Sequence, residues 1–255
     1  MLIDAHTHFD LFGENEAQAL AEIKQYRILS VANSMDPDSY RKNLDIGRDN
    51  GLILPIFGIH PFNAVKWADK LPELDWAFDQ SPLFGETGLD SRFAKDGSQW
   101  QAQTRVFQYF LDKAREQNKP VIVHSKGNEQ AVFDIISNYS LKKCIMHWFS
   151  GSLDFLRQLT SLGAFFTIGV EVLYSEHIRS IAREIPLELL LTETDNPLVK
   201  LSLPNALGLP RNIIDVVSEL AKAKKTTIER MMDSIQENFQ RVVGDNPDLS
   251  KLLLQ

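Results

Sequence analysis

The sequence predicts an α/β fold in which eight parallel strands alternate with helices and close into a single (β/α)₈ (TIM) barrel. Short apolar runs alternate with longer amphipathic segments eight times along the chain. No glycine-rich dinucleotide-binding fingerprint follows the first run. Such alternation is typical of parallel sheets, and right-handed crossovers allow either an open doubly wound sheet or a closed barrel. Eight repeats in 255 residues favour the barrel.

The apolar runs have the length and composition of buried strands. Runs of about four to eight hydrophobic residues are typical of a parallel sheet that is covered on both faces. The predicted strands are residues 2–5, 27–32, 53–58, 82–86, 120–124, 143–147, 164–168 and 188–192.

Segments with helical spacing lie between the runs and after the last one. Asp36 and Pro37 form an N-cap and first-turn pair that predicts the start of one helix. The other predicted helices are residues 14–25, 99–117, 128–139, 153–162, 175–184, 213–222 and 226–243. A loop rich in proline and glycine occupies residues 196–211, and no linker or charge block divides the chain, so one domain is expected over residues 1–255.

The overall charge argues against a generally basic surface for nucleic acid. The formal net charge is −7 at pH 7, so a polyanionic substrate would need positive charge from another source, such as bound metal ions. The single cysteine, Cys144, excludes an intramolecular disulfide and fits a reducing compartment. The sequence begins without a basic segment that leads into a long apolar stretch, and we therefore expect a cytoplasmic protein without membrane association.

The positions of the histidines predict a functional site. Of six histidines, four lie at the end of a predicted strand or just beyond it: His6, His8, His124 and His147. His60 lies in the loop after the third strand. Folding alone gives histidine no reason to prefer strand ends, whereas the carboxyl ends of barrel strands form the catalytic face.

His6 and His8 are two residues apart and therefore point to the same side of a strand, where both can reach one metal ion. Glu86 and Asp195 are expected to end the fourth and eighth strands. A buried carboxylate there is costly unless it is paired or bound to metal, although each one singly could be an ion pair or a loop cap. Barrel closure would bring Asp195 beside the first strand.

His124 and His147 end adjacent predicted strands that face Glu86, which favours a second ion. One ion would be held by His6, His8, Asp195 and Glu86, and the other by Glu86, His124 and His147. Open positions would remain for water and substrate, as catalytic sites require.

Six motifs at these positions resemble the TatD family of metal-dependent deoxyribonucleases, within the amidohydrolase-like superfamily. They are His-Thr-His at 6–8, Gly-Ile-His-Pro at 58–61, Gly-Glu-Thr-Gly-Leu-Asp at 85–90, Pro-Val-Ile-Val-His-Ser at 120–125, His-Trp-Phe-Ser-Gly at 147–151 and Glu-Thr-Asp-Asn-Pro at 193–197. The similarity follows the same order over nearly the whole chain, as far as Arg-Asn at 211–212 and Asn-Phe at 238–239.

The resemblance implies a metal-dependent nuclease whose ligands are His6, His8, Glu86, His124, His147 and Asp195. It also implies that His60 lies near the substrate phosphate. The chain differs from the family's frequent pattern at residues 125–127, where it has Ser-Lys-Gly, at residues 91–93, where it has Ser-Arg-Phe, and at Trp148, where cysteine is common. These differences fall among the expected substrate contacts, while the ligand set is complete.

The expected reaction is hydrolysis of DNA phosphodiester bonds, in single strands or at strand ends, by a hydroxide formed from water between two divalent ions (Mg²⁺, Zn²⁺ or Mn²⁺). Asp195 would act both as ligand and as proton acceptor, and Glu86 would bridge the ions. Candidate substrate contacts are His60, Lys126, Arg92 and Trp148, of which Trp148, like Phe149, could stack on a base or instead pack the barrel rim.

Two alternatives remain open at this point. The same centre could hydrolyse an amide, ester or lactone, which a smaller and more buried pocket would favour. The barrel could also bind metal without catalysis, but such a protein would be expected to lack a ligand, and none is missing.

Overall fold

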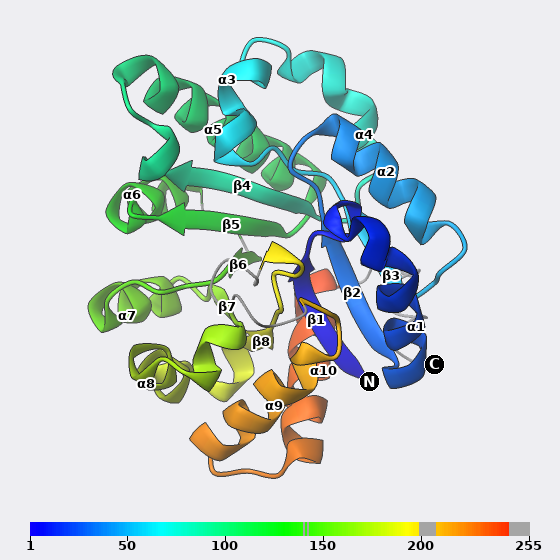
Figure 1. Ribbon diagram of the computed structural model, residues 1–255. Coiled ribbons are helices and arrows are strands. Elements are labelled where there is room, and N and C mark those ends of the chain that lie inside the picture. The colour runs from blue at the N-terminus through cyan, green and yellow to red at the C-terminus, as the bar shows by residue number, and fades with distance from the viewer. Residues whose placement is uncertain (140, 142, 199–207, 245–255) are drawn as a thin grey trace.

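Eight parallel strands lie in sequence order at the centre of the computed structural model, which describes residues 1–139, 141, 143–198 and 208–244, and helices surround them (Figure 1). The strands are β1 (Leu2–Thr7), β2 (Ile28–Asn33), β3 (Ile53–Ile56), β4 (Phe84–Asp90), β5 (Val121–Lys126), β6 (Cys144–Met146), β7 (Phe165–Ile168) and β8 (Leu190–Thr192). The predicted α/β class and parallel strand order are confirmed.

The strands form two sheets, β1-β2-β3 and β4-β5-β6-β7-β8, and hydrogen bonds cross both joints between them. At one joint Phe57 forms a parallel bridge with Phe84, and the amide of Gly85 donates to the carbonyl of Phe57 over 2.9 Å. At the other, the amide of Asp195 donates to the carbonyl of His6, also over 2.9 Å. The segment that follows β8 therefore lies beside β1, as the barrel arrangement requires.

Several strand ends differ from the prediction, and two of these differences involve a predicted ligand in the middle of the chain. Glu86 does not end β4, which continues to Asp90, and His124 does not end β5, which continues to Lys126. The additional residues pair across the two strands, with Gly88 opposite His124. The strands continue through these polar segments because several of the polar side chains form hydrogen bonds with one another within the site.

Ten α-helices lie within the described ranges. They are α1 (Glu16–Tyr26), α2 (Pro37–Gly47), α3 (Ala64–Trp67), α4 (Asp75–Gln80), α5 (Gly97–Gln117), α6 (Glu129–Tyr139), α7 (Leu153–Ser161), α8 (Glu176–Glu184), α9 (Asn212–Ala223) and α10 (Ile228–Val243). Asp36 caps α2 as predicted, because its carboxylate accepts hydrogen bonds from the amides of Asp38 and Ser39. Helices α3 and α4 were not predicted, since segments this short show no periodicity.

Residues 199–207 of the predicted 196–211 loop lie outside the described residues. No helix in the described ranges is both long and apolar enough to cross a membrane. Cys144 is buried in the core, and burial raises the pKa of its thiol to about 12, so it is an unreactive packing residue.

Asn238 ties α10 to the segment that leads into β8. Its side-chain amide donates to the carbonyls of Leu187 and Leu190 over 2.7 and 2.8 Å, and the residue is buried. Asn238→Ala leaves both carbonyls without this donor, and we expect the free energy of unfolding, measured in urea, to fall by about 1–3 kcal/mol. The exposed Gln240→Ala on the same helix is the control. Equal stability of the two variants would contradict the role of Asn238.

Candidate metal centre

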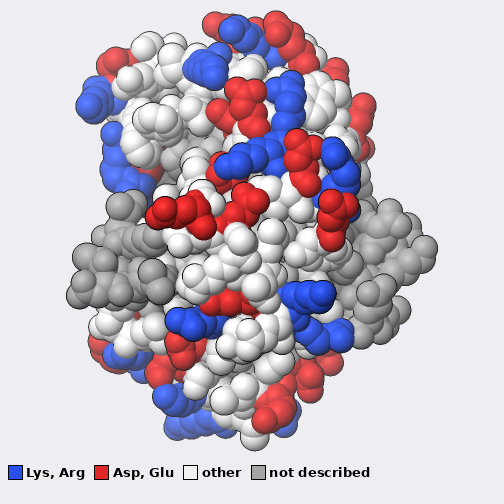
Figure 2. All heavy atoms as spheres, turned by 45° about the vertical axis from the view of Figure 1, so that its right-hand side comes forward, with Lys and Arg blue, Asp and Glu red and all other residues white. Residues whose placement is uncertain are grey.

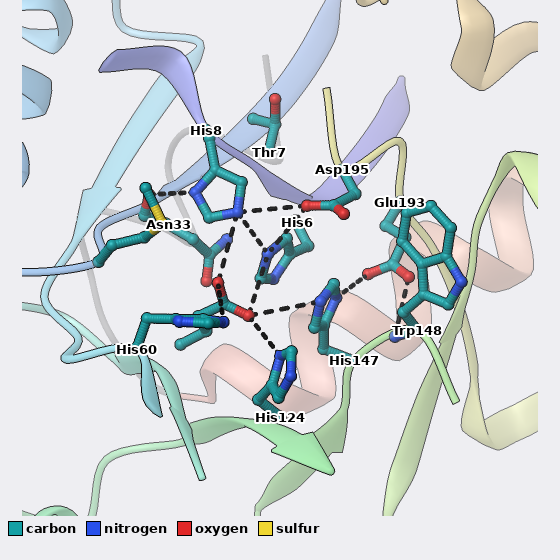
Figure 3. A network of polar contacts seen from close by, with 12 residues as sticks. His6, Thr7, His8, Asn33, His60, His124, His147, Trp148, Glu193 and Asp195 are labelled. Atoms are coloured by element: carbon teal, nitrogen blue, oxygen red, sulfur yellow. Dashed lines mark hydrogen bonds and ion pairs between the residues drawn. The ribbon is translucent and has the colours of Figure 1, made fainter. Parts of the chain in front are cut away.

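The six predicted ligands converge on one place. Figure 3 shows His6, His8, His124, His147 and Asp195 turned toward one another, and the distances from Glu86 to the histidines place its carboxylate among them. His6 lies in β1 and His8 directly after it, Glu86 lies in β4 and His124 in β5, while His147 follows β6. Asp195 lies beyond β8 in a left-handed backbone conformation, with φ of 52°. Asp195 has a side chain that is 15% exposed, and the other five ligands are buried.

Both carboxylate oxygens of Glu86 face imidazole nitrogens. Its Oε1 lies 3.4 Å from Nε2 of His8, and its Oε2 lies 3.0 Å from Nδ1 of His124. Oε2 also lies 3.4 Å from Nε2 of His147 and 3.8 Å from Nε2 of His6. Glu86 is therefore placed between histidines of three different segments, the position that a bridging carboxylate needs.

Asp195 closes the other side of the centre. Its Oδ1 lies 3.2 Å from Nε2 of His8 and 3.5 Å from Nε2 of His6, and the two Nε2 atoms are 3.3 Å apart. The donor atoms of His6, His8 and Asp195 lie within 4.8 Å of one another, as do those of His6, Glu86 and His147. His6 thus takes part in both groups, and the division of ligands between two ions stays a prediction.

Hydrogen bonds on the outer side of two rings orient them. Nδ1 of His8 lies 3.2 Å from the carbonyl of Asn33, and Nδ1 of His147 lies 2.7 Å from Oε2 of Glu193. Because both partners can only accept, each Nδ1 carries a proton, and each Nε2 is the ring nitrogen left to face the centre. This is the usual arrangement of metal-binding imidazoles.

Glu193 was not assigned a role from the sequence. Its carboxylate also accepts hydrogen bonds from Thr167 Oγ1 over 2.7 Å and from the amide of Trp148 over 2.9 Å. The sequence signal for a role of Glu193 was its position two residues before the predicted ligand Asp195. A carboxylate that is buried there needs several hydrogen-bond partners.

The donor set fits divalent cations. Oδ1 of Asp195 is a buried atom without a hydrogen-bond partner. The Nε2 atoms of His6 and His8 lie only 3.3 Å apart, and both face Oδ1 of Asp195. A cation among these atoms would remove the cost of leaving them unpaired, and imidazole nitrogens together with carboxylate oxygens suit Zn²⁺ or Mn²⁺.

Burial and mutual charge shift the pKa values of the centre strongly. Burial opposes ionisation of Glu86, but the surrounding histidines, His60 and His6 foremost, hold its pKa well below the usual range. Burial also lowers the pKa of His8 and His124, yet their carboxylate partners outweigh it and raise both values to about 9. Such opposed shifts within one cluster are typical of functional sites.

His60 presents a donor to the centre. Its Nδ1 accepts the amide of Phe62 over 3.0 Å, so Nε2 carries the proton of the neutral ring and lies 3.8 Å from Oε1 of Glu86. Burial lowers the pKa of His60 to about 3, which keeps the ring neutral. The ring atoms of His60 also lie near Asp90 and His124, but an N–H group donates hydrogen bonds and does not bind a cation.

Five of the six predicted ligands, all except His6, line a cavity of about 420 Å³ that His60, Arg92, Lys126 and Trp148 also line. A larger hollow of about 880 Å³, beside α10, contains none of these residues. Three of the four predicted substrate contacts at the cavity are already engaged within the protein: Nζ of Lys126 donates to Oγ of Ser150, Arg92 binds Asp90, and the indole of Trp148 donates to Glu171. Phe149 is only 2% exposed, so the option that it stacks on a base is wrong and the packing alternative is right.

Motif glycines let the strands that carry the ligands approach closely. A Cβ on Gly58 would lie 2.2 Å from the backbone carbon of Gly85, and one on Gly88 would lie 2.0 Å from the carbonyl oxygen of His124. Real Cβ contacts do not become so short, and thus only glycine fits at these two positions. The close approach sets the separation of Glu86 and His124.

Comparison with known proteins identifies the family. The model of the family described as TatD related DNase matches residues 3–244. The chain belongs to this TatD family of metal-dependent hydrolases. An uncharacterized metal-dependent hydrolase of Methanocaldococcus jannaschii is 29% identical over 244 residues, which cover 92% of this chain and 94% of the relative.

Two further TatD proteins are similar over nearly their full length. Human Deoxyribonuclease TATDN3 is 26% identical, with 99% of this chain and 97% of the relative covered. The crystal structure of YjjV, a TatD homolog from Escherichia coli, superposes with a TM-score of 0.84 at 22% identity and covers 94% of this chain and 97% of its own. The TatD likeness in structure confirms the TIM-barrel-like fold.

Proposed function

We propose that this protein is a deoxyribonuclease that hydrolyses phosphodiester bonds of DNA, in single strands or at strand ends, with two divalent ions. The observation that carries the proposal is the convergence of the other five ligand residues around Glu86, beside a cavity that Glu86 helps to line. The matched family's description and the name of the human relative both support DNA as the substrate. A barrel that binds metal without catalysis is not favoured, because the ligand set is complete.

The chain's own residues supply binding, orientation and proton transfer. His6, His8, Glu86, His124, His147 and Asp195 would hold the ions, which when bound stabilise charge on the phosphoryl group and acidify water. Oδ1 of Asp195, which has no hydrogen-bond partner, is positioned to accept a proton from the attacking water. Nε2–H of His60 would donate to a non-bridging phosphate oxygen, and the ammonium group of Lys126 would add a charge contact.

The test is cleavage of single-stranded DNA by protein that has been stripped with a chelator, with Mg²⁺, Mn²⁺ and Zn²⁺ added back separately. We expect cleavage with at least one ion and its loss in Asp195→Ala. If no ion restores cleavage although about two ions bind per chain, a small ester, amide or lactone becomes the better substrate class.

The surface charge predicts a weak dependence on salt. Acidic and basic side chains alternate over the face shown in Figure 2, which has no continuous basic area, and the net charge is −7. The described residues that line the cavity include two basic side chains, Arg92 and Lys126. Each phosphate contact to a single strand contributes a slope of about −0.7 to log K against log [salt], so we expect a total of about −1.4 for 1/KM. A slope steeper than about −4 would contradict this local mode of binding.

A further inference from the structure

An aromatic pair lies at the mouth of the cavity without a structural reason for its exposure. Phe62, in a short 3₁₀ turn (Pro61–Asn63) after β3, is 65% exposed, more than any other large hydrophobic side chain in the described ranges. Its ring contacts Phe93, which lies in a second 3₁₀ turn (Ser91–Phe93) after β4, with 5.2 Å between the ring centroids. Both side chains line the same cavity as the ligands.

The pair is joined to the metal centre by consecutive ring contacts. Phe93 lies 5.7 Å from His60, and His60 lies 4.8 Å from His124, measured between ring centroids. Phe93 therefore lies directly beside His60, and Phe62 lies beyond it. The group that follows a phosphate bound at His60 would then lie over these two rings.

We propose that Phe62 and Phe93 form a stacking platform for the nucleobase next to the scissile phosphate, and this inference rests on the proposed deoxyribonuclease function. Phenyl faces stack on every base, because all bases present a π-face. The guanidinium of Arg92 lies 5.5 Å from the centre of the Phe93 ring, where it adds positive charge near an anionic backbone.

The platform also selects the form of the substrate. A base within a continuous duplex has both faces covered by its neighbours, whereas a base in a single strand or at a frayed end can offer one face to a protein ring. Trp148 is less suited to this role, since its indole nitrogen is bonded to Glu171 and the protein itself fixes the ring. The platform thus favours unpaired DNA.

The test is a double-mutant cycle between Phe62→Ala and a single abasic site, which is moved in turn through each position near the scissile bond of a single-stranded oligonucleotide. We expect Phe62→Ala to raise KM about 5- to 150-fold with kcat nearly unchanged. An abasic site at the contacted position should raise KM of the wild type similarly and have no further effect in Phe62→Ala. Phe62→Trp should restore the wild-type KM.

Val65→Ala is the matched control. Val65 is 60% exposed in the adjacent helix α3 but does not line the cavity. The KM of the Val65→Ala variant should therefore equal that of the wild type. Binding without turnover can be measured with chelator-treated protein and an oligonucleotide that carries 2-aminopurine. We expect stacking to quench the 2-aminopurine fluorescence more in the complex with the wild type than in the complex with Phe62→Ala.

Either of two results would contradict the stacking platform. One is an equal KM for the wild type and Phe62→Ala, and the other is additive losses from the mutation and the abasic site at every position. If the wild type cleaves DNA in those experiments, the proposed deoxyribonuclease function still holds. Absence of DNA cleavage by the wild type with all ions overturns the proposed function and the platform together.

Discussion

We expect Glu86→Gln to lower kcat/KM for the proposed cleavage of DNA at least about 1,000-fold and to reduce the number of ions bound per chain. The substitution keeps the shape of the side chain but removes the negative charge that faces His8 and His124 at 3.4 and 3.0 Å. Loss of a carboxylate that bridges two ions is expected to cost about 4 kcal/mol or more of transition-state stabilisation. A loss of about 4 kcal/mol corresponds to a rate that is about 1,000-fold lower. Cleavage assays and metal analysis of the same preparation measure both effects.

Glu22→Gln is the control for the loss of a buried carboxylate as such. Glu22 is 6% exposed in α1 and accepts a hydrogen bond from the amide of Arg211, outside the cavity. Under the proposed function, we expect this variant to match the wild type in metal content and in cleavage of DNA. Full turnover by Glu86→Gln with a normal metal content would show that Glu86 does not bridge the ions.

Replacing Gly88 with alanine destabilises the fold by about 3 kcal/mol or more and impairs metal binding. The added Cβ would lie 2.0 Å from the carbonyl oxygen of His124 and 3.0 Å from its amide nitrogen, and Gly88 has φ of 149°, which L-residues rarely adopt. Neither atom can move without displacing β5, so the clash and the backbone strain both act against the native arrangement. Chemical denaturation measures the loss of stability, and titration with Zn²⁺ measures the loss of affinity.

Gly97→Ala provides the comparison. Gly97 begins α5, and a Cβ there meets nothing within 4 Å, so alanine should leave stability unchanged or raise it by up to about 1 kcal/mol. If Gly88→Ala unfolded at the same urea concentration as Gly97→Ala, the close contact between β4 and β5 would not exist in solution.

Hydrophobic patterning was sufficient to predict the strand order and the convergence of the ligands. Apolar runs mark the strands because both faces of the sheet are covered, and each ligand follows or ends such a run. The boundaries of β4 and β5 were missed for the opposite reason, since Asp90 and Ser125 are polar residues inside strands. Asp90 can lie there because Arg92 and His124 pair with its carboxylate, which depends on tertiary structure.

The orientation of the ligands could not be predicted from the sequence. The proton on Nδ1 of His147 is set by Glu193, and the one on Nδ1 of His8 by the carbonyl of Asn33. These partners lie far apart along the chain, so no local spacing shows them. The exposure of Phe62 was equally invisible, because a phenylalanine in a loop is usually packed against the protein surface.

The joint between β8 and β1 determines when the protein can acquire metal during its biosynthesis. Asp195 is synthesised 189 residues after His6, and the hydrogen bond from the amide of Asp195 to the carbonyl of His6 brings the two segments together. The complete set of predicted ligands therefore exists only when the segment after β8 lies beside β1. An ion that binds only this completed arrangement would stabilise the joint by mass action.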